Sequence, residues 1–419
     1  MSLKVLNIRD VAESQLCCGC GVCAYLSPDE IKIKDVTDHG RRPVLANDTV
    51  KDERSIEAFK SCPGIELEHH FDPESPGLIK ELTNAWGPVY GLWEGYATDE
   101  ELRFSGSSGG AASALSLFAL EGKKFHGVLH TAARSDIPYL NETVMSHNRG
   151  ELASRTGSRY APASPCEGLQ KIEDAPGPCV FIGKPCDVAG AQRARKLRPS
   201  LDKNLGLTIA FCCAGTPSTK GTLEMLKQMG VSDPSKLISI RYRGNGWPGK
   251  ATAVSRNDDG SEATAQLTYG QSWGGILQKH RQWRCYICID HTGEFADISV
   301  GDPWYGGVPD DAPGRSLILA RTERGKQFLA DAIEAGYLKA EPAEPWKLRA
   351  SQTGFLPNRG KVWARLWALR LMGGAVPRYL RMPMARYWWS DLGFKDKINS
   401  FMGTIRRIYQ KKLNQRAKL

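Results

Sequence analysis

The chain has 419 residues, of which 41% are hydrophobic and 24% are charged, a balance typical of a packed globular protein. This excludes a mainly disordered or fibrous chain, and the length predicts two or three domains. No run reaches the ~18 apolar residues of a membrane-spanning helix, and the N-terminus lacks the apolar segment of a secretory signal. We therefore expect a cytoplasmic protein, whose 12 cysteines favour metal binding over disulfides.

The net charge of +10 is concentrated at the C-terminus. Residues 361–419 hold 14 Lys and Arg against Asp391 and Asp396, a net +12, which leaves −2 for residues 1–360. A nearly neutral body with a basic tail does not match a nucleic-acid-binding protein. The tail also holds four of the 11 Trp, and its apolar residues from Phe394 to Leu413 follow a helical stripe.

Three regions follow one another along the chain. Residues 1–75 carry cysteines and many turns, residues 85–345 alternate between strands and helices, and residues 361–419 form the helical tail. The patterns predict an α/β (α+β) fold with a mixed sheet. We expect buried strands at 127–131, 179–183, 205–212 and 298–301. We also expect a hairpin of 250–256 with 262–269, and a helix at 322–335.

The strongest motif is Cys17-Cys18-Gly19-Cys20-Gly21-Val22-Cys23. Its C-x2-C-x2-C spacing is typical of a bacterial ferredoxin loop, because short Gly-containing spacers let a tight turn point several thiolates inward. The full motif continues with Cys-Pro, but Ser27-Pro28 stands there, and Cys62-Pro63 supplies the pair further along. We interpret Cys17, Cys20 and Cys23 as iron–sulfur ligands, with a zinc knuckle as the alternative. Cys18 could replace Cys17, although the position of Gly19 favours Cys17.

A second group of cysteines is dispersed. Cys285 and Cys288 form another C-x2-C pair, while Cys186 and Cys212-Cys213 follow predicted strands. The pair alone could be a redox dithiol or half of a zinc site, and a cysteine at a strand is usually a core residue. Since strand ends on one sheet edge converge, four thiols there would form a complete ligand set. Two further cysteines have no partner pattern and are predicted to be structural, namely Cys166 and Cys179.

The loop Phe104 to Gly110 leads into a small-residue helix over 111–120. Ser and Gly at a helix N-terminus offer N–H groups and hydroxyls that suit a phosphate, although a capped helix after a flexible loop is the alternative. The loop matches neither the Walker pattern nor G-x-G-x-x-G. Iron–sulfur clusters move single electrons, so neighbouring cluster ligands favour a flavin, which couples them to two-electron chemistry.

Together these motifs resemble the coenzyme F420 hydrogenase/dehydrogenase beta subunit family, which also includes ferredoxin-dependent chlorophyll-cycle and vinyl-reducing enzymes. The matching segments run in family order over residues 17–304. Besides the cysteine motifs and the Ser105–Gly110 loop they include Gly157-Ser-Arg-Tyr160, Gly183-Lys-Pro-Cys186-Asp-Val-Ala-Gly190, Cys213-Ala-Gly-Thr-Pro-Ser218, Tyr242-Arg-Gly-Asn-Gly-Trp-Pro-Gly249 and Ala296-Asp-Ile-Ser-Val-Gly-Asp-Pro-Trp304.

The resemblance implies an FAD flavoprotein with two 4Fe-4S clusters. It implies that residues 1–75 form a ferredoxin-like 4Fe-4S region, and that residues 85–345 bind FAD and the second cluster. The ligands it implies are Cys17, Cys20, Cys23 and Cys62 for the first cluster, and Cys186, Cys213, Cys285 and Cys288 for the second. The implied FAD residues are Ser105, Gly106, Ser107, Ser108, Gly109 and Gly110 at the phosphates, with Arg159, Tyr160, Lys184 and Arg243 around the flavin. The chain departs from the family at Ser27, so the first cluster depends on Cys62.

The function implied is that of an oxidoreductase. Electrons would pass between an external carrier (ferredoxin or a reduced deazaflavin), the clusters and FAD, with hydride transfer to or from a small organic substrate. The alternative is an electron-transfer beta subunit of a larger hydrogenase or dehydrogenase complex, and a remote alternative is a zinc-bearing binding module. The basic tail predicts peripheral contact with the inner membrane surface or, equally, a helical cap. A homo-oligomer is compatible with the sequence.

Overall fold

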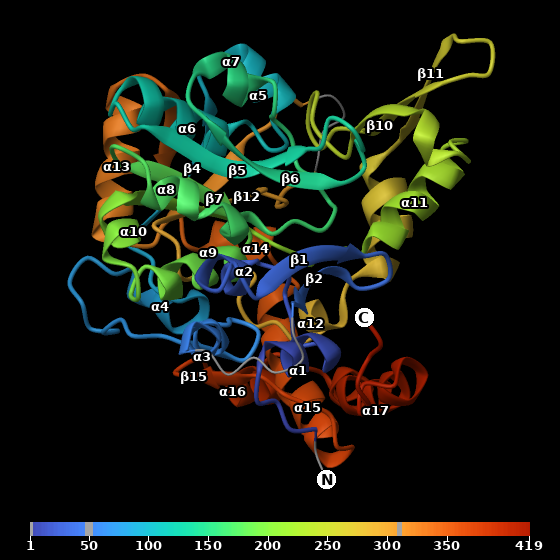
Figure 1. Cartoon of the computed structure of the whole chain (residues 1–419). Coiled ribbons are helices and arrows are strands. Elements are labelled where there is room, and N and C mark those ends of the chain that lie inside the picture. The colour runs from blue at the N-terminus through green and yellow to red at the C-terminus, as the bar shows by residue number, and fades with distance from the viewer. Residues whose placement is uncertain (1–2, 47–52, 308–311) are drawn as a thin grey trace.

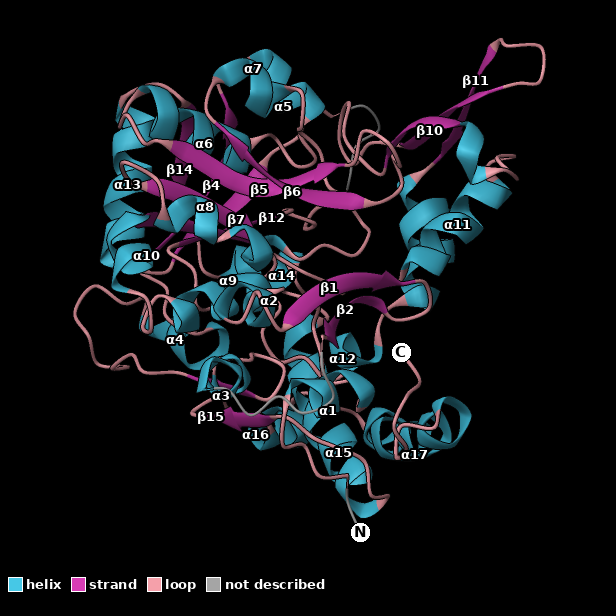
Figure 2. Cartoon of the chain, in the orientation of Figure 1, coloured by secondary structure: helices cyan, strands magenta, loops and turns pink. Residues whose placement is uncertain are grey.

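A mixed eight-stranded sheet forms the centre of the protein (Figures 1 and 2). The computed structural model describes residues 3–46, 53–307 and 312–419. Four central strands run parallel in the order β12-β8-β7-β5, and antiparallel strands flank them on both sides. In sheet order the strands are β14 (Leu338–Pro342), β4 (Gly91–Ala97), β13 (Ser316–Ala320), β12 (Ile298–Gly301), β8 (Leu205–Phe211), β7 (Cys179–Gly183), β5 (Gly127–Ala133) and β6 (Asn141–Ser146).

The predicted mixed sheet and its four buried strands are therefore confirmed. The central strands are mostly apolar because both of their faces are covered, and successive side chains point to opposite faces. On β7, Phe181 packs into a core shared with the N-terminal region and the C-terminal helices. Val180 and Ile182 pack on the other face, against α6 (Ala111–Glu121) and α13 (Glu323–Glu334). This makes a three-layer arrangement.

The remaining helices lie around the sheet (Figure 1). The predicted helix over 322–335 is α13, which begins where the Thr322 side chain accepts a hydrogen bond from the Gly325 N–H at 3.0 Å. The other helices are α1 (Ile8–Glu13), α2 (Val22–Leu26), α3 (Glu53–Lys60), α4 (Lys80–Trp86), α5 (Glu100–Ser105), α7 (Arg149–Ala153), α8 (Gln170–Glu173), α9 (Pro185–Ala194), α10 (Pro199–Asn204), α11 (Thr219–Gln228), α12 (Trp283–Tyr286), α14 (Trp346–Ser351), α15 (Phe355–Leu371), α16 (Ala385–Ser390) and α17 (Phe394–Lys411).

Three small sheets complete the architecture. The predicted hairpin is confirmed as β10 (Ala251–Arg256) paired antiparallel with β11 (Glu262–Leu267), and it projects from the body with β9 (Leu237–Arg241) beside it (Figure 2). An N-terminal hairpin joins β1 (Ile31–Val36) to β2 (Gly40–Leu45). In the third sheet β3 (Glu66–Glu68) pairs in parallel with β15 (Arg378–Leu380), so the N-terminal region and the tail share a sheet.

The tail is helical as predicted, but α17 does not bury the whole of its apolar stripe. Ser400, Thr404 and Ile408 are its buried residues, packed on the side that α15 covers. Part of the apolar stripe lies beside that contact and stays at the surface, where Phe394, Ile398, Met402 and Tyr409 are exposed. No helix in the described part of the chain is long and apolar enough to cross a membrane.

Candidate functional site

The first thiol group consists of the four cysteines expected to bind the first cluster. They line one cavity together with Cys18, and the set is Cys17, Cys20, Cys23 and Cys62. The loop that presents three of them turns through Gly19 and Gly21, whose φ angles of 74° and 88° favour glycine. A Cβ on Gly19 would lie 2.9 Å from the Arg41 carbonyl oxygen, so the loop also needs the space. The Gly19 N–H donates to the Cys17 Sγ at 3.3 Å, as N–H groups do around iron–sulfur clusters.

Cys62 reaches this cavity from the far end of the N-terminal region. It follows α3, where its N–H donates to the Phe59 carbonyl at 3.1 Å. A Cβ on Gly64 would lie 2.6 Å from the Leu16 carbonyl oxygen, so the Cys-Pro-Gly segment packs directly against the first loop. Ser27 is buried elsewhere, with its Oγ 3.3 Å from the Ser55 Oγ. The placement supports Cys62, not the Ser27 position, as the fourth donor.

The thiols of the first group share one electrostatic environment. Burial and the neighbouring Cys17 together raise the pKa of Cys62 to about 12. Burial, Cys17 and Cys62 likewise raise the pKa of Cys23. Several thiolates in one dry cavity repel one another, so a positively charged inorganic core would be needed to hold them ionised together.

The second thiol group consists of Cys186, Cys213, Cys285 and Cys288. Its members come from the first turn of α9, the residues after β8 and the segment around α12. Burial raises the pKa of Cys213, and Cys285, Cys186 and Cys288 raise it further, in that order. The Thr216 N–H donates to the Cys285 Sγ at 3.3 Å, and the Cys288 thiol donates to the Asp290 carbonyl at 3.3 Å.

The structure also separates Cys213 from its neighbour Cys212. The Cys212 Sγ packs on β12, where a Cβ on Gly301 would lie 2.5 Å from it. Burial raises the pKa of Cys212, but the charged groups that act on it are Arg321 and two carboxylates rather than thiols. Cys213 is thus the member of the pair that faces the second thiol group.

Two further cysteines lie between the groups: Cys18, the alternative to Cys17, and Cys166, which the sequence predicts to be structural. Hydrogen bonding with Cys186 lowers the pKa of Cys18, while hydrogen bonding with Cys20 and burial raise it, and the net result is well above the ordinary value. Cys18 therefore contacts one cysteine of each thiol group. Cys166 lies beside Cys20, and its thiol donates to the Asp187 carbonyl at 3.1 Å. Their positions depend on the packing of α2 against α9, which no spacing rule reveals.

Across the described ranges, no set of three or more His, Cys, Asp or Glu side chains converges closely enough for a single metal ion. The first thiol group instead surrounds a cavity, and an all-cysteine donor set with an N–H group directed at sulfur is the chemistry of an iron–sulfur cluster. The second thiol group has the same donor chemistry. The residues present therefore fit such groups.

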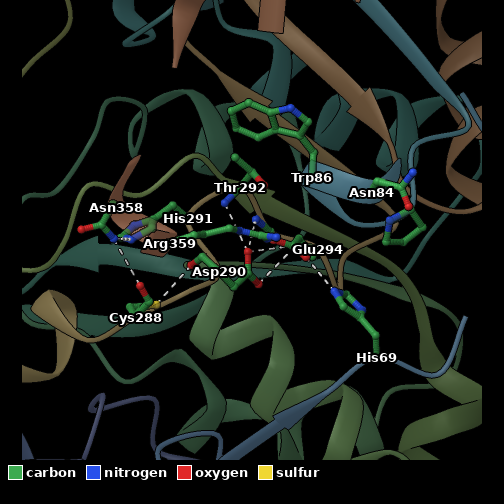
Figure 3. Close-up of polar contacts among 12 residues, drawn as sticks. His69, Asn84, Trp86, Cys288, Asp290, His291, Thr292, Glu294, Asn358 and Arg359 are labelled. Carbon is green, nitrogen blue, oxygen red and sulfur yellow. Dashed lines mark hydrogen bonds and ion pairs between the residues drawn. The ribbon is translucent and has the colours of Figure 1, made fainter. Parts of the chain in front are cut away.

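A buried polar network lies behind the second thiol group (Figure 3). His291 contacts the Cys213 carbonyl through Nδ1 at 2.8 Å and the Asn358 amide through Nε2 at 2.7 Å. Further along the same segment, Glu294 forms an ion pair with Arg359 of α15 and lies 2.6 Å from the His69 Nε2. Arg359 and His69 thus fix the segment that follows Cys288. Arg359, His69, His291 and Glu294 are buried, and Asn358 is half-buried.

The Ser105–Gly110 loop lies at the other candidate site. Gly109 and Gly110 have φ angles of 84° and 73°, and α6 starts directly after them. No described residue accepts a hydrogen bond from the N–H groups of residues 107–110. The Ser105 Oγ is buried and has no hydrogen-bond partner in the described part of the chain. Unused N–H groups at a helix N-terminus, beside an unsatisfied hydroxyl, fit the phosphate of a bound nucleotide.

Two family motifs contact this loop. The Ser158 N–H donates to the Ser107 Oγ at 2.6 Å, which joins the loop to Gly157-Ser-Arg-Tyr160. The Gly246 N–H donates to the Phe104 carbonyl at 3.0 Å, which joins it to the segment 242–249. The structure therefore brings together three segments that the sequence could only place in order.

The four residues expected around the flavin are in different surroundings. Arg243 and Tyr160 are neighbours, with the guanidinium 3.5 Å from the Tyr160 hydroxyl. Lys184 lies on the side of the second thiol group, where its Nζ donates to Asp187 at 2.6 Å. Arg159 donates to the Asn141 side chain at 2.8 Å and to the Ile240 carbonyl at 2.9 Å. Contact of these four side chains with a flavin stays a prediction.

Arg243 is the centre of a buried group with Asp302. The two form a bidentate ion pair, and the Trp247 Nε1–H donates to the same carboxylate at 2.7 Å. Aromatic rings surround the guanidinium, with the Tyr269 and Trp304 ring centroids 5.0 and 5.3 Å away. Burial lowers the pKa of Arg243, but Asp302, Tyr160 and Tyr269 together raise it by more, so the arginine stays charged. The result is a fixed positive charge beside flat aromatic rings.

Comparison with known proteins identifies the family. The N-terminal profile of the coenzyme F420 hydrogenase/dehydrogenase beta subunit matches residues 92–171, and the C-terminal profile matches residues 178–345, together more than half of the chain. The chain belongs to this family. Its fold resembles a chain of the F420-reducing NiFe hydrogenase complex from Methanosarcina barkeri, with a TM-score of 0.52 at 20% identity over 71% of this chain and 98% of that chain.

Curated relatives are oxidoreductase subunits. Subunit beta of F420-dependent formate dehydrogenase 1 from Methanococcus maripaludis is 26% identical over 65% of this chain and 67% of its own length. The coenzyme F420 hydrogenase subunit beta from Methanothermobacter thermautotrophicus is 25% identical over 65% of this chain and 87% of its own length. The family member described here is accordingly an oxidoreductase component that acts in electron transfer. The profile matches end at residue 345, so α15 to α17 lie outside them.

Proposed function

We propose that this family member is an iron–sulfur flavoprotein that works as the electron-transfer subunit of a larger hydrogenase or dehydrogenase complex. The observation that carries the proposal is the convergence of Cys17, Cys20, Cys23 and Cys62 on one cavity. The family's relatives, which are subunits of F420-linked complexes, support the same conclusion. A zinc-bearing binding module would need neither the second thiol group nor the open loop before α6.

Each thiol group would hold one 4Fe-4S cluster, and the loop before α6 would hold FAD. Such clusters supply single-electron transfer, and the flavin supplies the pairing of two electrons as a hydride. The chain's own residues fix the sulfur positions, bury the cysteines of the first thiol group and direct the Gly19 and Thr216 N–H groups at sulfur. N–H···S bonds of this kind stabilise the more negative, reduced state.

The FAD side of the proposal depends on preorganised charge. The N–H groups of residues 107–110 would bind the pyrophosphate, while Arg243 presents a positive charge that Asp302 holds in one orientation. A buried cation next to the flavin ring would favour its anionic reduced form. The rings of Trp247 and Trp304, whose centroids are 5.5 Å apart, would provide a flat apolar contact.

A second candidate is a stand-alone reductase that acts on an organic substrate. It is favoured by a coenzyme F420-dependent sulfite reductase from Methanocaldococcus jannaschii, which is 22% identical over 78% of this chain and 47% of that protein's length. The two candidates differ in their electron donors. Rapid reduction by a reduced deazaflavin is expected of the subunit, whereas turnover of an organic substrate by the isolated chain would support the stand-alone enzyme.

The decisive experiment is anaerobic quantitation of iron, sulfide and flavin in the purified protein. We expect about eight iron atoms and one FAD per chain, because two 4Fe-4S groups and one nucleotide site are proposed. About four iron atoms would mean that one thiol group binds no cluster. A colourless preparation that contains zinc would refute the proposal.

Contact of the tail with the inner membrane surface stays a prediction, as do a cytoplasmic location and a homo-oligomer. The exposed row Phe394, Ile398, Met402 and Tyr409 on α17 supports the membrane contact, because Lys and Arg flank it. Sedimentation with anionic liposomes tests it, since a chain that lacks residues 394–419 should lose any binding that the whole chain shows. Equal sedimentation of both chains would remove the idea.

A further inference from the structure

The ring of Tyr286 is surrounded by positive charges. Tyr286 lies inside the C-x2-C pair of the second thiol group and is half-buried. The Arg281 guanidinium lies 4.6 Å from the centroid of its ring, the Arg407 guanidinium 5.8 Å and the Lys411 Nζ 5.9 Å. Arg365 of α15 donates to the Tyr286 carbonyl. We call these five residues the Tyr286 patch.

The charges of the patch are not neutralised by acidic side chains. Within the described ranges, none of its four cations forms an ion pair with Asp or Glu. Burial and the positive charges of Arg407 and Arg281 together lower the pKa of Arg365 to about 10. By contrast, Arg324 forms an ion pair with Asp297 at 2.8 Å. Like charges held this close repel one another, so an anionic partner would bind here favourably.

The patch also adjoins the second thiol group in the chain. Tyr286 stands between Cys285 and Cys288 and stacks on Trp283, with ring centroids 6.0 Å apart. Figure 1 shows α12 next to the C-terminal helices, and α17 supplies Arg407 and Lys411 from its last two turns. These two cations and Arg365 lie outside the family match, which ends at residue 345. The tail thus adds positive charge at the outer side of the cysteine pair.

We propose that the Tyr286 patch is the docking surface for a protein electron carrier with an acidic face. The proposal rests on the proposed function, because the docked carrier exchanges one electron with the group held by the second thiol group and is itself oxidised or reduced by that electron. Charge complementarity favours this partner, and the short path through the cysteine pair explains why it docks there. A bilayer would instead contact the exposed apolar row of α17, and the residues of the patch are not part of that row.

The test compares two charge reversals on the same helix. Arg407→Glu with Lys411→Glu alters the patch, while Lys395→Glu with Arg406→Glu changes as much charge at residues that are exposed on α17. Binding of the full-length protein to an acidic two-cluster bacterial ferredoxin is measured by calorimetry at low and at physiological salt. Melting temperatures, iron content and reduction by dithionite, which needs no docking, are measured for every variant. Gln variants at the two patch positions serve if the Glu variants unfold.

We expect the patch variant to bind ferredoxin at least about tenfold more weakly at low salt, and the control to bind less than about threefold more weakly. Both should keep the iron content and the dithionite reduction of the unaltered protein. Equal weakening in both variants would overturn the proposal, because it would show only a general charge effect. Loss of binding to anionic vesicles, with ferredoxin binding unchanged, would overturn it in favour of a membrane. Missing iron in the unaltered protein would instead refute the proposed function.

Discussion

Replacement of Gly109 by alanine tests whether the loop before α6 holds FAD. Gly109 has a φ of 84°, and a Cβ there would lie 2.6 Å from the Arg315 Cα and 2.8 Å from its N. The left-handed conformation costs alanine about 1–2 kcal/mol. The contact with backbone adds about 1–3 kcal/mol, since a main chain cannot rotate away as a side chain would. Gly109→Ala should therefore destabilise the protein by about 2–5 kcal/mol.

Gly230 provides the matched control. It has a φ of 87°, but nothing lies within 4 Å of a Cβ built there. Gly230→Ala should therefore cost only the conformational part, about 1–2 kcal/mol. With an unfolding entropy of about 2.1 cal/mol/K per residue, these costs correspond to about 1–2 °C for the control and about 2–6 °C for Gly109→Ala.

The assay measures melting temperature and the ratio of FAD to protein in anaerobic preparations. Because the alanine must displace the loop or Arg315, we expect Gly109→Ala to lose most of its FAD, while Gly230→Ala keeps the ratio of the unaltered protein. Equal melting temperatures for the two variants would refute the steric argument. A lower melting temperature with full FAD content would show that the loop is structural and does not bind the nucleotide.

Three further predictions concern the thiols, the buried ion pair and pH. Cys62→Ser should lower the iron content from about eight to about four atoms per chain, while Cys166→Ser should retain about eight, because a hydroxyl can also donate to its carbonyl partner; equal iron in both variants would argue against Cys62 as a ligand. Asp302→Asn leaves a buried arginine unpaired and should cost about 3–5 kcal/mol, or about 3–6 °C, whereas Asp136→Asn removes an exposed pair and should leave the melting temperature nearly unchanged; similar melting temperatures for the two variants would contradict this. Burial lowers the pKa of His130 to about 4, so its contribution to stability is complete above the unfolded pKa of about 6.5 and is lost as the pH falls toward 4. At pH 5.5 this loss is about 1.4 kcal/mol. Between pH 7.5 and 5.5 the melting temperature of His130→Gln should therefore fall by about 1–2 °C less than that of the unaltered protein, and equal falls would be inconsistent with the prediction.

Local pattern was enough to predict much of the framework. The mainly apolar runs at 179–183 and 298–301 are β7 and β12, because strands covered on both faces need predominantly apolar residues. The turn signal Asn257-Asp258-Asp259-Gly260 predicts a hairpin, and the antiparallel pairing of β10 with β11 confirms it. Cysteine spacing predicted which thiols belong to the N-terminal loop, since the chemistry of a short turn depends on residues that are adjacent in sequence.

Other features were decided only by tertiary packing. Whether Cys62 reaches the first loop depends on the contact between Gly64 and the Leu16 carbonyl, and nothing in the sequence around Ser27 or Cys62 fixes that contact. The same is true of the pairing of Arg243 with Asp302, which joins two motifs distant in the chain.

The tail shows the difference most clearly. Its charge and helical stripe can be read from composition and periodicity, because both are local properties of the chain. Which side of α17 is buried was set by the docking of α15, which covers Ser400, Thr404 and Ile408 and leaves much of the apolar row at the surface. That docking also carries Arg407 and Lys411 to the ring of Tyr286. The sequence specifies the charges of Arg407 and Lys411, but only the folded chain places them at the ring of Tyr286, because they lie more than a hundred positions from it in the chain.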